Sequence, residues 1–96
     1  MLGPLFNLGR IVATPNALSS ISEPRLRECL HSHQYGDWGS VRQEDAREND
    51  LSVGKGFRIL SCYAIDPTKP AVDDNRLWIL TEADRSVTTV LLPEEY

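Results

Sequence analysis

The chain lacks most of the features that identify secreted domains and common enzymes. It has only two cysteines, Cys29 and Cys62, whereas small secreted domains are usually held together by several disulfides. The Gly54-Lys55-Gly56 stretch has neither the length nor the following hydroxyl of a phosphate-binding loop. No GxSxG or Cys/His nucleophile pattern is present. These absences exclude a disulfide framework and the best-known nucleotide and hydrolase motifs, and two isolated thiols favour a reducing, cytoplasmic location.

Long apolar runs are missing as well. The N-terminal sequence MLGPLFNLGRIVA is apolar, but glycine, proline, asparagine and arginine interrupt it and no basic lead precedes it. It fits neither a signal peptide nor a membrane span, so we expect no membrane association.

Positive charge is scarce. The chain has 10 Lys and Arg residues against 14 Asp and Glu residues, a net charge of −4, and the basic residues are scattered. This balance opposes nonspecific binding to phosphate backbones, so a nucleic-acid partner is not expected outside the ribonuclease alternative below. The composition, 41% hydrophobic and 25% charged, is that of a folded globular protein, and its 96 residues suffice for one domain, residues 1–96.

The first half of the chain carries helix signals after one strand. We expect the strand and three helices over residues 8–13, 15–21, 23–35 and 40–53. Thr14 and Ser22 are the expected N-caps of the first two helices, each followed closely by a proline. Ser40 and Gln43 have the spacing of a capping box for the third.

The second half predicts strands over residues 57–65, 76–81 and 86–92. The charged turn at residues 82–86 joins the last two strands into a hairpin. We therefore expect an α+β fold, with an N-terminal strand and two or three short helices packed on a C-terminal three-stranded antiparallel meander.

Both faces of this meander are apolar. Alternation places on one face Phe57, Ile59, Tyr63, Ile65, Leu77, Ile79, Val87 and Leu91. The other face carries Leu60, Cys62, Trp78, Leu80, Val90 and Leu92. A sheet with one face in water alternates cleanly, so the second face needs a cover. The candidates are a protein partner, a second copy of the chain, or the N-terminal segment with Leu2, Leu5, Phe6 and Leu8.

Cys29, His31, His33 and Asp37 lie close enough in sequence to invite a metal-site interpretation. Residues two apart on a helix point roughly 200° apart, so these groups diverge. The chain also lacks the second ligand pair of a zinc motif, and we expect no metal and no cofactor.

His33 ends the apolar face of the second helix, next to a glycine-bounded loop. A pKa near 6.5 suits general acid or base catalysis, but a histidine hydrogen-bonded at the edge of the core is the commoner case. Asp37 and Trp38 in the loop are candidate binding residues. The alternative is that Trp38 anchors the loop to the core.

Polar side chains also gather around the C-terminal hairpin. They are Ser61, Tyr63, Thr81, Glu82, Asp84, Arg85, Thr88 and Thr89. Such a group could form a binding pocket in which Arg85 orients a phosphate or carboxylate, with Glu82 and Asp84 beside it. The structural alternative is that Asp84 and Arg85 hydrogen-bond the turn and that the threonines are strand formers.

Three segments of the chain resemble a family of small uncharacterised bacterial proteins found on plasmids, phages and chromosomes and often labelled plasmid-related proteins. The segments are HQYGDWG, RILSCYAI and LWILTEADRSVTTVLLPEEY, with Asp45 and Asn49 between the first two. The resemblance covers roughly residues 8–96 outside the turn after Asp66, and TEADRS is its most specific part. It implies no established activity. Some members carry a label from the methylation subunit of restriction enzymes, which does not fit so short a chain without a cofactor-binding glycine loop.

Two functions are consistent with these observations. The first is a small cytoplasmic interaction protein of mobile-element type, an accessory or anti-defence factor that binds another protein, because the sheet is apolar on both faces and no catalytic constellation stands out. Its mobile-element origin rests only on the resemblance. The second, by fold analogy with barnase-type and RelE-type toxins, is a metal-independent ribonuclease. His33 would then be the general acid or base and Arg85 would stabilise the phosphorane. Ser61, Tyr63 and Thr88 would position the RNA.

Overall fold

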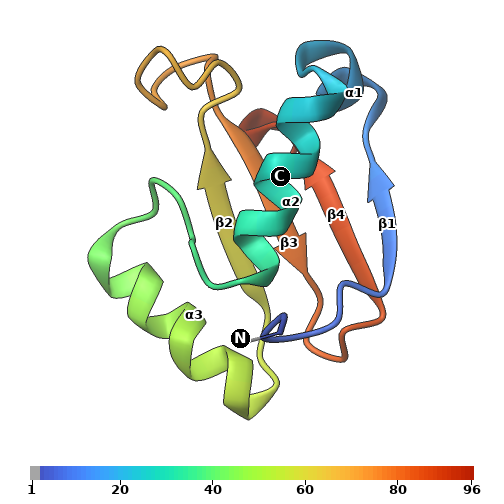
Figure 1. The fold of residues 1–96 in the computed structure, drawn as a ribbon, viewed down its shortest axis with the longest axis vertical. Coiled ribbons are helices and arrows are strands. Elements are labelled where there is room, and N and C mark those ends of the chain that lie inside the picture. Colours follow the sequence, from blue (N-terminus) through green and yellow to red (C-terminus); the bar gives the residue numbers. More distant parts are fainter. Residues whose placement is uncertain (1–2) are drawn as a thin grey trace.

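The computed structural model describes residues 3–96, which form one four-stranded sheet in the order β1-β4-β3-β2 (Figure 1). The strands are β1 (Arg10–Ala13), β2 (Ile59–Tyr63), β3 (Leu77–Thr81) and β4 (Val87–Leu91). β2, β3 and β4 pair antiparallel, and β1 pairs parallel to β4. The α+β prediction is confirmed, and the N-terminal strand extends the meander into a mixed sheet.

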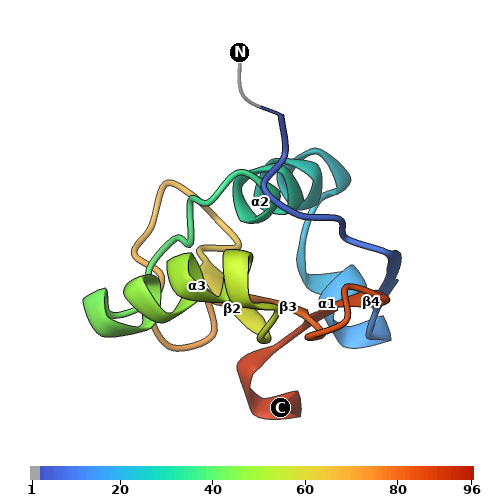
Figure 2. The ribbon, with the colours of Figure 1, turned by 90° about the horizontal axis from the view of Figure 1, so that it is seen from below.

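Helices α1 (Pro15–Ser20) and α2 (Glu23–Gln34) begin at the predicted N-caps. The hydroxyls of Thr14 and Ser22 accept the backbone N–H three residues later, at 3.1 and 3.3 Å, and a proline lies in each first turn. α2 crosses one face of the sheet, called the inner face below (Figures 1 and 2). The main core cluster on this face contains Ala17, Ile21, Cys29, Tyr63, Leu77, Ile79 and Val90.

Helix α3 (Gln43–Lys55) runs beside β2, at the edge of the sheet (Figure 2). The predicted capping box is wrong, because Arg42 is the N-cap and makes no side-chain cap bond. Ser40 bonds the sheet instead: its N–H and its hydroxyl both donate to the carbonyl oxygen of Cys62, at 2.8 and 3.3 Å. Within residues 3–96 no helix is long and apolar enough to cross a membrane.

The N-terminal segment packs on the inner face. The Phe6 ring is buried and stacks on Trp38, with ring centroids 6.2 Å apart. The Leu5 N–H donates to the carbonyl of Gln34, and the Gln34 side chain donates back to the carbonyl of Phe6. The part of this segment that the structure describes therefore does not cover the opposite face, contrary to one expectation. Leu2 lies outside the described residues.

The register of β4 differs from the predicted register by one residue. Trp78 pairs with Leu91 and Ile79 with Val90, so Val90 faces inward and Leu91 faces outward. The reason lies in the turn over residues 82–86, where one residue adopts a left-handed conformation. The turn, rather than the alternation within β4, sets which side chains face the core, and a slip of one residue exchanges the two faces.

The opposite or outer face of the sheet carries Leu60, Cys62, Trp78, Leu80, Thr89 and Leu91. Among residues 3–96, no helix lies across the outer face of β2 and β3; α3 flanks it, and the C-terminal turn at Pro93–Glu95 lies beneath it (Figure 2). This face is therefore the more open side of the molecule.

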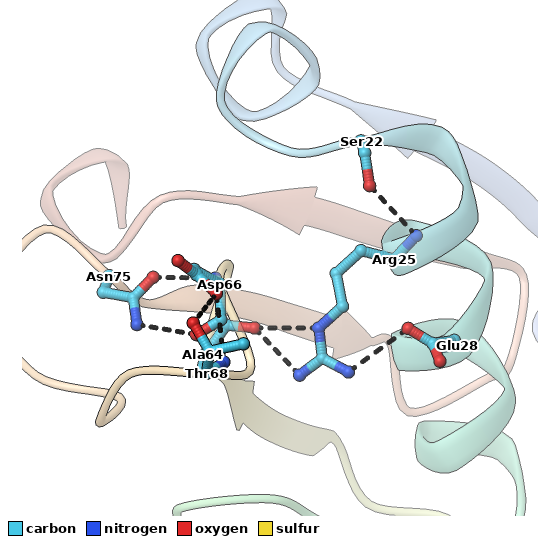
Figure 3. Close-up of polar contacts among 7 residues, drawn as sticks. All are labelled: Ser22, Arg25, Glu28, Ala64, Asp66, Thr68 and Asn75. Carbon is cyan, nitrogen blue, oxygen red and sulfur yellow. Dashed lines mark hydrogen bonds and ion pairs between the residues drawn. The ribbon is translucent and has the colours of Figure 1, made fainter.

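A cationic side chain ties α2 to the end of β2. The Arg25 guanidinium donates two hydrogen bonds to the carbonyl of Ala64, at 3.0 and 2.9 Å (Figure 3). Beside it, the Asn75 side chain accepts the N–H of Asp66 and donates to its carbonyl, which closes the loop between β2 and β3. These contacts hold the loop in place without using the outer face.

Candidate functional site

The structure brings three of the predicted site residues, His33, Ser61 and Thr88, into one chain of hydrogen bonds. His33 Nδ1 lies 2.5 Å from Ser61 Oγ, and His33 Nε2 lies 2.9 Å from Thr81 Oγ1. Thr81 Oγ1 lies 2.7 Å from Thr88 Oγ1, which donates to the carbonyl of Leu8 at 2.7 Å. We call the four side chains His33, Ser61, Thr81 and Thr88 the buried network. All four residues are 0% exposed.

The Leu8 carbonyl, at the end of this series of hydrogen bonds, determines which group donates in each of them. A carbonyl only accepts, so the single hydroxyl proton of Thr88 points at Leu8. Thr81 must then donate to Thr88, and His33 Nε2–H must donate to Thr81. His33 Nδ1 is left as the acceptor of the Ser61 hydroxyl proton. The buried network is fully satisfied with a neutral imidazole protonated on Nε2.

The surroundings of His33 keep it neutral. Burial, and to a smaller extent the nearby positive charge of Arg85, together lower the pKa of His33 to about 4. The Phe6 and Trp38 rings meet the imidazole edge to face, with centroids 5.3 and 6.0 Å away. A histidine in this setting stays unprotonated at neutral pH and is shielded from solvent.

Tyr63, Asp37 and Trp38 hold the loop between α2 and α3. The Tyr63 hydroxyl donates to the carbonyl of Asp37 at 2.6 Å, and burial raises the pKa of this hydroxyl. The Asp37 carboxylate accepts the N–H of Gly39 at 3.2 Å. Trp38 Nε1 donates to the carboxylate of Asp50 at 2.9 Å, and Trp38 itself is 5% exposed. The aromatic residue proposed for binding thus anchors the loop to α3 and to the core.

Arg85 uses its guanidinium within the protein. It donates to the carbonyls of Phe57 and Ser52, at 2.6 and 2.7 Å, and lies over the Phe6 ring at 5.4 Å from its centroid. It also adopts a left-handed backbone, with φ of 60°. Arg85 therefore joins the hairpin turn to the end of α3 and to the N-terminal segment.

The two acidic residues of the hairpin also shape the turn. The Asp84 carboxylate accepts the hydroxyl and N–H of Ser86, at 2.6 and 3.0 Å, and the hydroxyl bond is the main reason that the pKa of Asp84 is lowered. The Glu82 carbonyl accepts the N–H of Arg85 at 2.9 Å. These contacts match the structural alternative given for the hairpin residues.

The order Ser61, His33 and Thr81 has the connectivity of a nucleophile, a base and an orienting group. A substrate atom would have to reach Ser61 Oγ, and Ser61 has no exposed surface. Tyr63 bonds a different partner, and Arg85 is occupied by carbonyls. In this arrangement His33, Ser61 and Thr88, linked by Thr81, join α2 to β2, β3, β4 and the N-terminal segment.

A groove lies elsewhere, between the start of α3 and the outer face of β2 and β3. It consists of two adjoining hollows of about 340 and 220 Å³, and Val41, Asp45 and Leu60 line both. The first hollow is also lined by Ser40, Arg42, Cys62, Arg76 and Trp78. The second is also lined by Glu48, Asn49, Arg58 and Leu80. We call this feature the outer groove.

The outer groove has an apolar floor and charged rims. Leu60 and Trp78 are half-buried, so apolar surface is accessible within it. Arg42 and Arg76 stand at the end where Trp78 lies, and Arg42 is 3.3 Å from the carboxylate of Asp45. This combination of accessible apolar surface with fixed charges is suited to recognising a partner.

Arg58 and Arg76 were not among the predicted site residues, although their positions in the predicted strands indicate which face of the sheet they share. Residues two apart on a strand share a face, so Arg58 continues the row of Leu60, and Arg76 continues the row of Trp78. Extending the alternation beyond the apolar residues would have found both arginines.

Within residues 3–96 no three His, Cys, Asp or Glu side chains are grouped so as to hold a metal ion. No protein-family model matches the chain, and no curated protein or solved structure matches it. The geometry of the chain itself is therefore the basis for any functional proposal.

Proposed function

We propose that this protein acts by binding another protein through the outer groove. The observation that carries the proposal is the position of accessible Leu60 and Trp78 on a sheet face that no helix of residues 3–96 crosses, between charged rims. Concave apolar surface with a few fixed polar groups is the usual form of a recognition site. Small size and a net charge of −4 are compatible with such a role.

We place the binding protein in the cytoplasm, as an accessory or anti-defence factor of a mobile element. The location is supported by two free, buried cysteines, and burial raises the pKa of Cys29 to about 11, which keeps this thiol unreactive. The mobile-element role rests on the sequence resemblance alone.

The ribonuclease alternative has less support from the geometry. General acid or base catalysis needs a group within reach of the substrate, and His33 is 0% exposed. The guanidinium of Arg85 would have to leave two carbonyls before it could meet a phosphate. The same residues have complete structural roles, so binding is the better proposal.

The test is whether capture of a partner depends on the outer groove. The wild-type protein is immobilised and incubated with host extract, and one protein that it captures specifically is identified. The amount of this protein captured is then compared between wild type and two variants. Leu60→Glu places a charge on the groove floor and should abolish capture, whereas Leu18→Glu, at a residue of α1 that is 54% exposed, should leave it intact. Circular dichroism checks that both variants fold, and Arg76→Glu provides a second groove variant. Capture that survives both groove variants would overturn the proposal.

A further inference from the structure

The outer groove borders a seat that already holds an aromatic ring. Tyr96 meets Trp78 edge to face, with centroids 5.3 Å apart, and its ring lies 5.8 Å from the guanidinium carbon of Arg58. Arg58 also donates a hydrogen bond to the Tyr96 hydroxyl. Trp78 and Arg58 both line the outer groove. We call these two side chains the aromatic seat.

The ring in this seat is held lightly. Tyr96 is 60% exposed, so most of its surface contacts water rather than protein. The preceding residue is fixed more firmly, because the Glu95 carboxylate accepts bonds from Leu92 N–H, the Thr14 hydroxyl and the Asn16 side chain. Tyr96 can therefore leave the aromatic seat without loss of the contacts that anchor the turn.

Free hydrogen-bond donors lie next to the aromatic seat. Arg76 donates through Nε to the carbonyl of Asp73, and its two terminal nitrogens have no partner among residues 3–96. It lines the same hollow as Trp78 and Arg42. A planar guanidinium of this kind binds carboxylates in pairs of hydrogen bonds.

Both a nucleic-acid base and an aromatic side chain of a peptide could stack in the aromatic seat. The charges of the groove distinguish between these two ligands. A nucleic-acid strand would bring phosphates past Asp45 and Glu48, which line the groove, onto a protein of net charge −4. A peptide carries its negative charge only where it has acidic side chains, and one of these can be placed at Arg76. The arrangement favours a peptide.

We propose that the outer groove binds an acidic segment of the partner protein that carries an aromatic residue. The aromatic ring replaces Tyr96 between Trp78 and Arg58, and an acidic side chain of the segment meets Arg76. The chain's own Glu94-Glu95-Tyr96 has this chemistry and competes for the same seat. This inference rests on the proposed function and names its ligand.

The test uses the full chain and a synthetic peptide, LLPEEY, with the sequence of residues 91–96 and a fluorescent label. Tyr96→Ala empties the seat and should bind the peptide at least tenfold more tightly than wild type, by fluorescence anisotropy. Tyr35→Ala, at another exposed tyrosine, is the matched control and should bind as wild type does. Adding Arg76→Glu to Tyr96→Ala should weaken binding at least tenfold, as should a peptide with lysines in place of its glutamates.

Equal affinity of wild type and Tyr96→Ala, or no effect of Arg76→Glu, would overturn the inference. So would self-association of wild type that Tyr96→Ala abolishes, because the occupant would then be the tail of a second copy. If the peptide does not bind but partner capture still depends on Leu60, the ligand chemistry is wrong and the proposed function stands. Capture that survives Leu60→Glu and Arg76→Glu contradicts the proposed function itself.

Discussion

The side-chain amide of Asn49 hydrogen-bonds both backbone groups of Leu60. Asn49 Nδ2 donates to the Leu60 carbonyl at 2.8 Å, and the Leu60 N–H donates to Asn49 Oδ1 at 3.2 Å. β2 is an edge strand, and the next outward-facing residue, Cys62, is paired in the same way with the backbone of Trp38 and Ser40. α3 and its loop thus supply the partners of a missing strand and close this edge against other chains.

Asn49→Ala should lower the free energy of unfolding by about 1–3 kcal/mol, because it leaves a partly buried N–H and a partly buried carbonyl of Leu60 without partners. Urea unfolding followed by circular dichroism measures the change. Gln43→Ala, at an exposed position of the same helix, is the control and should change stability by less than about 0.5 kcal/mol. A similarly small change for Asn49→Ala would show that water replaces the Asn49 side chain as the hydrogen-bond partner of the Leu60 backbone.

Stability should fall with acid between about pH 6.5 and pH 4 because of His33. Its pKa is about 4 in the folded protein, below the ordinary value of 6.5, so in this range the unfolded chain binds a proton that the folded chain does not. The contribution is complete above pH 6.5 and is lost as pH falls through 4. The full loss is about 3 kcal/mol.

Melting temperatures measured from pH 7 to pH 4 test this expectation. His31→Gln, which removes the exposed histidine, should keep the acid sensitivity above pH 5, and His33→Gln should reduce it even if the variant is less stable overall. An NMR titration of the His33 ring gives the pKa directly, and a value near 6.5 would contradict the burial argument.

Gly39→Ala should be strongly destabilising. Gly39 has a φ of 74°, and a Cβ placed on it would lie 1.9 Å from the carbonyl oxygen of Cys62, where the loop bonds the edge of β2. We expect a loss of about 2 kcal/mol or more in thermal unfolding. Gly54→Ala is the opposite case, because it lies in α3 with no atom within 4 Å of its Cβ position. It should stabilise the protein by about 0.5–1 kcal/mol, and equal effects at the two glycines would contradict this account.

The two tryptophans should separate stability from binding. Trp38→Ala should cost about 3–5 kcal/mol, because the ring is 5% exposed and bonds Asp50 through Nε1. Trp78→Ala removes a half-buried ring from the outer face and should cost less stability while abolishing partner capture. Thermal unfolding and the capture assay are run on both variants. Unchanged melting of Trp38→Ala, together with lost capture, would make Trp38 a recognition residue.

The purified protein should not cleave RNA, with or without divalent metal. The test incubates wild type with single-stranded and structured RNA and compares it with His33→Ala and Arg85→Ala. Cleavage by wild type that falls roughly a hundredfold or more in folded forms of both variants would support the ribonuclease alternative, because general acid or base catalysis typically contributes that much.

Local signals in the sequence were sufficient for the elements and their order. Thr14 and Ser22 cap their helices because each hydroxyl accepts a backbone N–H only three residues later. This hydrogen bond does not depend on distant parts of the chain. Ser40 has the same local signal, but the carbonyl of Cys62 takes its hydroxyl, and that competitor lies 22 residues away. A long-range hydrogen bond of this kind is not visible in a capping pattern.

The candidate site was predictable only in part. The type of the residues made His33, Ser61 and Thr88 candidates, and the structure does bring them together. A histidine hydrogen-bonded at the edge of the core was the commoner expectation for His33. The complete burial of these residues could not be predicted, because it depends on the register of β4 and on the Phe6 ring that covers the network from the N-terminal segment. The outer groove was hidden for a related reason: α3 forms one of its walls, and the packing of α3 beside β2 follows from contacts between distant residues.

The parallel pairing of β1 with β4 makes completion of the sheet depend on two strands that are far apart in the sequence. Arg10 pairs with Val87, 77 positions later, so β1 cannot pair in the sheet until β4 has been synthesised. Closing so long a loop is entropically costly and slow, and we expect β2, β3 and β4 to assemble with their helices first. The hydrogen bond from Thr88 to Leu8 then fixes the N-terminal segment to β4, and we expect it to form in the last step of folding. A nascent or truncated chain without β4 would lose both its own hairpin and its hold on the N-terminal segment.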